Sequence, residues 1–170
     1  PRTLQTIRHP DDHSQKLYGT GGIKPLFVSH RRGPTEHSPM FVYRWAETKS
    51  ALQRLKGYAG SPYDGVIFEY IDPVTGGSVM PTMSFRCQML QAGQKTLSHR
   101  KTASTVYCVL EGEGYTEVEG QRLEWKRNDV FTVPGWLWHS HHNTSAQDAF
   151  LYSVTDEPAV RKLGLFREEG

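Results

Sequence analysis

The stretch NDVFTVPGWLWHSHHN (128–143) places three histidines within four residues, shortly after a Pro-Gly turn. Imidazoles at this density indicate a metal site, a proton relay or a chance grouping. Because residues two apart on a β-strand point to the same face, His139 and His141 can face one side while His142 faces the other. The question is whether other parts of the chain supply further ligands.

Short segments rich in β-branched and aromatic residues occupy most of the chain from Gly65 onward. Turn residues such as Asp72-Pro73, Gly76-Gly77 and Pro134-Gly135 separate them. Many short strands at near-regular spacing predict an all-β fold, an antiparallel sandwich or barrel. The expected strands are VIFEYI (66–71), MSFRCQML (83–90), TVYCVL (105–110), YTEVE (115–119), QRLEW (121–125), DVFTV (129–133) and AFLYSVT (149–155).

A second stretch, GQKTLSHRKTASTVYCVLEG (93–112), carries another histidine, His99. Together the two stretches resemble the two halves of a cupin metal motif. The first half of that motif has a glycine at each end and His-x-His followed by Glu, and the second half contains Pro, His and Asn. Motif residues are kept at Gly93, His99, Gly112, Pro134, His139 and Asn143. This resemblance implies a cupin double-stranded β-helix, or jelly roll.

The chain departs from the motif at four positions. Lys101 stands where the second histidine is expected and Thr105 where the glutamate is expected, while Asn128 and Trp136 replace two glycines. A protonated lysine has no lone pair to give a metal, and a threonine hydroxyl is a weak replacement for a carboxylate. The metal site that the motif would build is therefore expected to be degenerate.

Two interpretations of the remaining histidines stay open. In one, His99, His139 and His141 form a substitute metal-binding trio, with the strand regular as far as His141. In the other, His99 and His139 are hydrogen-bonded interior groups, and His141 and His142 lie at the rim or surface. His9, His13, His30 and His37 are expected to be solvated.

Nearly the whole chain resembles the C-terminal half of a gentisate 1,2-dioxygenase, a family of tandem cupins that includes 1-hydroxy-2-naphthoate and salicylate dioxygenases. The stretches that carry the resemblance are LYGTGG (17–22), HSPMFVYRWAETKSALQRL (37–55), YIDPVTGGSVMPTMSF (70–85), STVYCVLEGEG (104–114), EWKRNDVFTVPGW (124–136) and LGLFREE (163–169).

This resemblance implies a parent enzyme that opens the ring of gentisate or a related hydroxylated aromatic acid with dioxygen. Its ferrous iron would be held by three histidines of the other cupin, so a degenerate site and a structural or assembly role are expected for this half. Homo-oligomers are implied as well. Two alternatives are a self-contained cupin without metal that binds a small ligand or shapes an oligomer, and a one-site metalloenzyme using the histidine trio.

Side chains on the strands suggest further ligand contacts. Arg86, Gln88, Tyr107 and Trp138 are candidate pocket residues, and Arg86 and Gln88 share a strand face. An inward arginine could hold a carboxylate through two hydrogen bonds, whereas the alternative places Arg86 on the solvent face. Trp136 and Trp138 are interpreted as core or interface aromatics.

The expected organisation is an extended arm or inter-cupin linker (1–45), a bridging helix and loop (46–64), a cupin barrel (65–157) and a short helix with a tail (158–170). The first helix is expected over Thr48–Lys56, with Thr48 as its cap and Gly57 at its end. The second helix spans Pro158–Leu163. Because the chain begins with Pro1, we expect it to be part of a longer protein.

Composition narrows the class of protein. The net charge is +2 and the basic residues are dispersed, which argues against a nucleic-acid partner. Apolar runs fall short of the roughly 18 residues of a membrane span, and the chain opens without a signal-like segment, so no membrane partner is expected. Cys87 and Cys108 lie in apolar runs and are expected to be reduced, consistent with a cytoplasmic protein.

Overall fold

The computed structural model describes residues 15, 21, 26 and 38–170. Most of the expected arm (1–45), with its four histidines, therefore lies outside the described residues. The remaining part of that arm, from residue 38 to residue 44, is without helix or strand. Among the described residues, no helix is long and apolar enough to cross a membrane.

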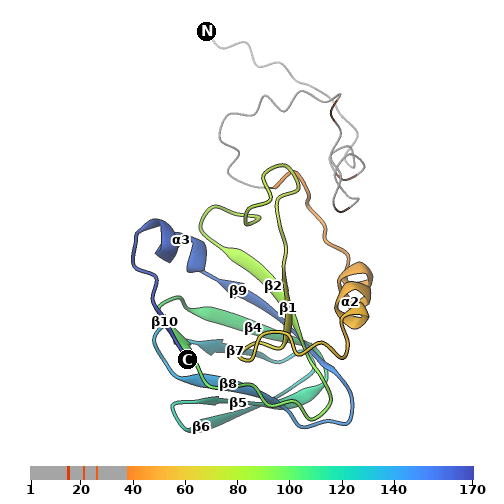
Figure 1. The fold of residues 1–170 in the computed structure, drawn as a ribbon, viewed down its shortest axis with the longest axis vertical. Coiled ribbons are helices and arrows are strands. Elements are labelled where there is room, and N and C mark those ends of the chain that lie inside the picture. The colour runs from red at the N-terminus through yellow and green to blue at the C-terminus, as the bar shows by residue number, and fades with distance from the viewer. Residues whose placement is uncertain (1–14, 16–20, 22–25, 27–37) are drawn as a thin grey trace.

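Antiparallel strands are the main regular structure of the described chain, with a helix before the first strand and another after the ninth (Figure 1). The elements are α2 (Trp45–Arg54), β1 (Val66–Glu69), β2 (Ser84–Leu90), β3 (Arg100–Lys101), β4 (Thr105–Glu111), β5 (Glu113–Val118), β6 (Gln121–Lys126), β7 (Val130–Val133), β8 (His139–Asn143), β9 (Ala149–Thr155), α3 (Glu157–Lys162) and β10 (Glu168–Glu169).

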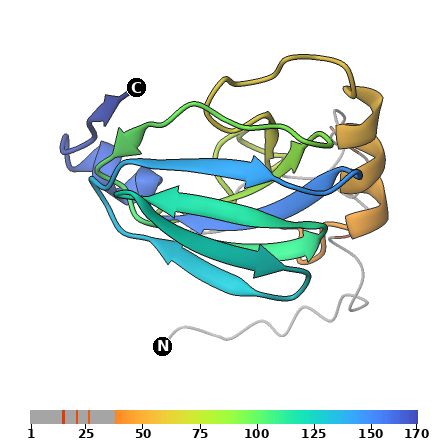
Figure 2. The same ribbon diagram turned by 90° about the horizontal axis from the view of Figure 1, so that it is seen from below.

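Two sheets form the barrel. The larger has the strand order β1-β2-β9-β4-β7, the second has the order β6-β5-β8, and β10 pairs with β3. Isolated bridges from Lys95 to His142 and from His99 to His139 continue the second sheet beyond β8. Figure 2 shows α2 against one end of this barrel and α3 at the opposite end. The all-β jelly-roll prediction is confirmed.

The strands bury apolar side chains on both faces of the larger sheet. The inner cluster fills the barrel and includes Leu90, Val109, Trp125 and Leu151. The outer cluster lies between that sheet and α2, and its fully buried Leu52 packs with Cys87, Met89 and Phe150. Both described cysteines, Cys87 and Cys108, are free thiols, as the sequence predicted.

The first helix begins earlier than its capping pattern predicted. It starts at Trp45 after Arg44, and the Thr48 hydroxyl donates to the Arg44 carbonyl from within the first turn. Thr48 is thus inside the helix, and its expected role as the N-cap is wrong. The helix ends at Arg54, three residues before Gly57. The second helix lies within one residue of its prediction, with Pro158 in its first turn.

Two residues that replace motif glycines adopt the backbone conformation that glycine favours. Asn128 has φ +73° and Trp136 has φ +67°. L-residues seldom enter this left-handed region, and bulky ones do so least. The amide of Trp136 donates to the Lys101 carbonyl over 2.7 Å, which ties the loop to the neighbouring strand. The turns of the cupin motif are therefore preserved in backbone shape although their glycines are lost.

Candidate functional site: the barrel interior

Strand pairing brings the histidines of the two motif stretches together inside the barrel. His139 and His141 lie on β8, and the bridge between His99 and His139 joins that strand to the segment before β3. His99, His139 and His141 are at most 2% exposed. His142 is also buried, stacked on Tyr115 with ring centroids 4.2 Å apart. The interpretation that placed His141 and His142 at the rim or surface is wrong, because β8 is covered on both faces.

Hydrogen bonds define the proton positions on His99 and His139. His139 Nδ1 lies 3.1 Å from the Leu137 carbonyl, which can only accept, so Nδ1 carries the proton. The neutral His139 ring then has a lone pair on Nε2, and His99 Nε2 donates to it over 3.0 Å. His99 Nδ1 is left as an acceptor without a hydrogen-bond partner, 3.8 Å from Glu168 Oε1.

A second chain of hydrogen bonds defines the proton position on His141. Trp125 Nε1 donates to Thr116 Oγ1 over 3.0 Å, and Thr116 Oγ1 lies 2.8 Å from His141 Nδ1. Because Thr116 is fully buried, its hydroxyl proton needs an acceptor, and His141 Nδ1 is the acceptor within reach. His141 therefore carries its proton on Nε2, and this buried atom has no hydrogen-bond partner.

Burial keeps these imidazoles neutral near pH 7. Desolvation, followed by the nearby His139, lowers the pKa of His99 to about 4. Desolvation lowers the pKa of His139 as well, and that of His141 falls well below its ordinary value for the same reason. The charge of Lys101 contributes to lowering the pKa of all three rings. The lysine is thus electrostatically close to the histidine group.

Lys101 and Thr105 occupy the motif positions that would supply the other two metal ligands. Lys101 is 7% exposed and Thr105 is 6% exposed. Lys101 follows His99 by two residues, so its side chain leaves the strand on the same side as that of His99. Among the lysines of residues 38–170, those in ion pairs are Lys49 and Lys56, so Lys101 has no carboxylate partner there.

These residues do not fit ferrous iron as a catalytic centre. Iron sites of this class use two histidines and a carboxylate, or three histidines, around open positions. Here His99 and His139 hydrogen-bond to each other, and a cation and a hydroxyl stand at the other motif positions. Among the described residues, no three His, Cys, Asp or Glu side chains are grouped so that they could hold a metal ion.

The structure brings three of the four predicted ligand-contacting residues to one face. On β9, Ser153 pairs with both Arg86 of β2 and Tyr107 of β4, and Leu151 pairs with Gln88 of β2. Leu151 belongs to the inner cluster, so the side chains that share its face point into the barrel. Tyr107 lies edge-on to His141 with ring centroids 4.8 Å apart. Gln88 is 1% exposed, and neither polar atom of its amide has a hydrogen-bond partner.

Arg86 and Trp138 differ from Gln88 and Tyr107. The Arg86 guanidinium donates to Glu157 Oε2 over 2.8 Å, so the carboxylate that it binds belongs to α3 of the same chain. This pairing lowers the pKa of Glu157 against the opposing effect of burial. Trp138 lies outside the barrel interior, where the Arg100 guanidinium sits 4.8 Å from its ring centroid.

Sequence reasoning missed the residues at the mouth of this interior. Tyr63 stacks on His99, with ring centroids 5.0 Å apart and planes within 1° of parallel. Asp64 contributes a negative charge that raises the pKa of His99 and His139 against burial. Both residues lie in a turn between α2 and β1. No spacing in the sequence relates this turn to His99.

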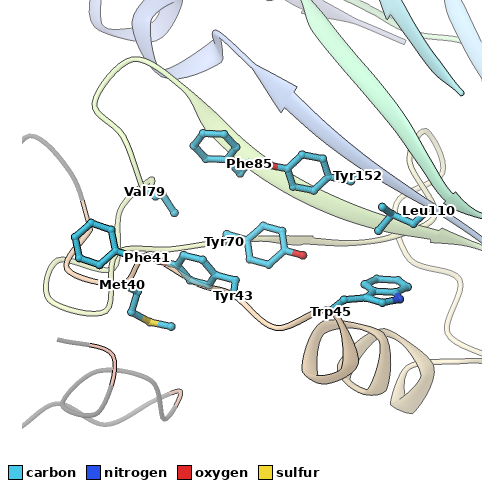
Figure 3. A pocket seen from close by; sticks show the side chains of 9 residues that line it. All are labelled: Met40, Phe41, Tyr43, Trp45, Tyr70, Val79, Phe85, Leu110 and Tyr152. Atoms are coloured by element: carbon cyan, nitrogen blue, oxygen red, sulfur yellow. The ribbon is translucent and has the colours of Figure 1, made fainter. Parts of the chain in front are cut away.

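A separate hollow of about 390 Å³ lies on the outer face of the larger sheet, beside the start of α2. Figure 3 shows aromatic rings from β2 and β9 gathered beside rings that precede α2. The Tyr43 hydroxyl donates to the Ile71 carbonyl over 2.7 Å, and the Tyr43 ring meets Tyr70 edge-on. The lining residues are Met40, Phe41, Tyr43, Trp45, Tyr70, Val79, Phe85, Leu110 and Tyr152.

Comparison with known proteins agrees with this architecture. The cupin domain family model matches residues 87–155. A 5-aminosalicylate 1,2-dioxygenase from Comamonas sp is 43% identical over 94% of this chain. The chain is thus a cupin whose homologues are gentisate and salicylate dioxygenases. Gentisate 1,2-dioxygenase 1 from Aquipseudomonas alcaligenes is 34% identical over 97% of this chain.

Solved structures of the family have the same fold. The salicylate 1,2-dioxygenase from Pseudaminobacter salicylatoxidans superposes with a TM-score of 0.82 at 29% identity, over 92% of this cupin and 45% of that chain. This cupin spans 42% of the length of the Comamonas relative and 46% of the Aquipseudomonas relative. The matched region is thus less than half of each of these proteins.

Proposed function

We propose that this cupin is the C-terminal half of an iron-dependent dioxygenase that opens the ring of gentisate or a related hydroxylated aromatic acid. Within that enzyme, it has a structural and assembly role rather than a catalytic one. The observation that carries the proposal is the donor set of the barrel interior. Lys101 stands at a ligand position. His139 is oriented like a metal ligand, but its Nε2 atom accepts a hydrogen bond from His99.

His139 illustrates how the site has changed. A metal-bound histidine usually donates its second ring N–H to a carbonyl or carboxylate, and His139 makes this contact with Leu137. The lone pair on its Nε2 atom accepts a hydrogen bond from His99 instead of facing a metal. Family relatives more than twice as long as this chain have room for a second cupin, and the proposal assigns the iron to that other half.

The assembly role is supported by apolar surface outside the barrel. Near the aromatic hollow, Phe41 is 76% exposed and Ile71 is 46% exposed. Exposed apolar side chains beside an apolar hollow suggest contact with another protein surface. We propose that the intact enzyme is a homo-oligomer in which this face contributes to packing.

Activity assays on two proteins test the proposal. The 170-residue chain, supplied with ferrous iron, gentisate and dioxygen, is expected to give no ring-opened product by ultraviolet absorbance. A longer natural protein that contains this chain is expected to turn over under the same conditions. Robust turnover by the 170-residue chain would contradict the assignment of catalysis to the other half.

A second candidate function is a self-contained cupin that binds a small ligand or a metal through His99, His139 and His141. The burial of His141 beside the other two rings favours this alternative, in which His141 would release its Nε2 proton to bind a metal. Metal analysis of the purified chain separates the two candidates. One bound transition metal per chain, lost on His141→Phe substitution, would support the second candidate.

A further inference from the structure

Polar atoms without partners are concentrated in the barrel interior. Four of the buried unpartnered atoms found among the described residues are His99 Nδ1, His141 Nε2, Gln88 Nε2 and Gln88 Oε1. All belong to side chains that are at most 1% exposed. Buried polar groups in folded proteins almost always have a partner, so four such atoms inside the barrel, a region called the chamber below, indicate a bound polar species.

The chamber is richer in open donors than in open acceptors. His141 Nε2 carries a proton, because Thr116 donates to the other ring nitrogen. The Gln88 amide adds N–H donors, and the Lys101 ammonium adds others. The open acceptors are His99 Nδ1 and Gln88 Oε1. An occupant that accepts hydrogen bonds therefore matches this chamber better than one that donates them.

The charge of the chamber also favours an acceptor with negative charge. Lys101 is buried and without a carboxylate partner in the described chain, whereas the neighbouring Arg86 charge is balanced by Glu157. The charge of Asp64 acts on the pKa of His99 and His139, whereas the pKa of His141 is affected by Lys101 and not by Asp64. Asp64 accepts from Ser61, and Glu168 is 48% exposed. The Lys101 ammonium is not among the buried atoms without a partner, so it keeps some contact with solvent, and a small anion beside it would complete an ion pair.

We propose that the barrel interior binds a small carboxylate, of the size of formate or acetate, among the side chains of Lys101, His141 and Gln88. The two carboxylate oxygens can accept from the ammonium and from the imidazole N–H at the same time. Tyr63 stacks on His99 and Tyr107 lies edge-on to His141, so rings lie beside the proposed site and favour a small occupant. The site is independent of the catalytic assignment above.

Nuclear magnetic resonance of the histidine side chains tests this site directly. The 170-residue chain is titrated with sodium formate and with sodium acetate, and the His141 Nε2–H resonance is followed. A saturable shift is expected for both. A shift of equal size with sodium chloride at the same ionic strength, or no saturable shift at all, would overturn the proposal. Benzoate provides a further arm. Saturable binding of benzoate would extend the site to the carboxylate of an aromatic acid.

Substitutions then locate the anion. Lys101→Met is expected to weaken formate binding at least tenfold, and Gln88→Leu is expected to weaken it measurably. Lys126→Met is the matched control, because Lys126 is exposed on β6 and its loss should leave binding unchanged. If Lys101→Met fails to fold, Gln88→Leu carries the test. Formate binding that is unchanged in every variant that folds would overturn the assignment.

Discussion

His99 and His139 are paired on neighbouring strands with their Nε2 atoms 3.0 Å apart, and His99 is the donor. Two nitrogens each about 2.1 Å from a metal and at right angles would be separated by about the same distance. The pair thus keeps the spacing of two metal ligands while one proton occupies the space between them. What separates this arrangement from a metal centre is the chemistry of its neighbours, chiefly Lys101.

The first prediction is that Lys101→His increases metal affinity. The new imidazole would lie two residues from His99 on the same inward face, and the substitution also removes the buried positive charge. Calorimetry with zinc ion should show binding at least tenfold tighter than in the unchanged chain. Lys126→His on the exposed side of β6 is the control. No gain over this control would mean that position 101 does not face the histidine pair.

The second prediction concerns pH and stability. The pKa of His99 in the folded chain is lowered to about 4, below the unfolded value near ~6.5. Between these values the unfolded chain binds more protons, so the stabilisation is present above pH ~6.5 and is lost as pH falls toward 4. Urea unfolding should show stability decreasing by roughly 3 kcal/mol across this window, at about 1.4 kcal/mol per unit of pKa difference.

His99→Gln is the matched variant for this measurement. The amide of glutamine can still donate to His139, but it does not titrate. Its stability should fall less steeply between pH 6.5 and pH 4.5 than that of the unchanged chain. Equal slopes in both proteins would show that His99 is not the group responsible.

The third prediction concerns the left-handed turn at Asn128. Its φ of +73° is tolerated by asparagine and glycine but is strained for a β-branched residue. Asn128→Gly should leave the free energy of unfolding unchanged or slightly higher, while Asn128→Val should lower it by about 1–2 kcal/mol. Residue 128 is exposed, so neither substitution changes packing much. Arg127→Val, at the preceding exposed position, should cost under roughly 0.5 kcal/mol.

These turns show which parts of the fold could be predicted from sequence. Motif spacing located the loops even where Asn128 and Trp136 replace glycine, because the backbone conformation is retained. Strand β8 was expected only from the spacing of the histidine motif and not from hydrophobicity, since its sequence HSHHN has no apolar alternation although all five residues are buried. Polar side chains satisfied by neighbours can be buried as completely as apolar ones, and period-2 hydrophobicity cannot detect such a strand.

The site required more than local spacing. Strand parity correctly grouped Gln88 with Arg86 and His139 with His141. The proton positions depend on long-range partners, such as Trp125 acting on His141 through Thr116. Likewise, Glu157 binds Arg86 from 71 residues further along the chain. Such contacts arise from the folded topology, so no short pattern in the sequence encodes them.

The last prediction concerns association and the arm. Residues 38–45 lie along the chain's own barrel, where Ser38 pairs with the backbone of Val79 and Tyr43 contacts Tyr70. The exposed Phe41 and the aromatic hollow beside it need further cover, and an open jelly roll also has sheet edges. We therefore expect the 170-residue chain to form at least a dimer, with residues 1–37 contributing to its stability.

Light scattering on the chain with and without residues 1–37 measures this association, and urea unfolding at two protein concentrations measures its coupling to stability. Stability that rises with protein concentration is expected for the complete chain, because association favours the folded state. The shortened chain should dissociate at higher concentration than the complete one. Monomers in both cases, equally stable to urea, would show that residues 1–37 cover neither the barrel nor a second copy.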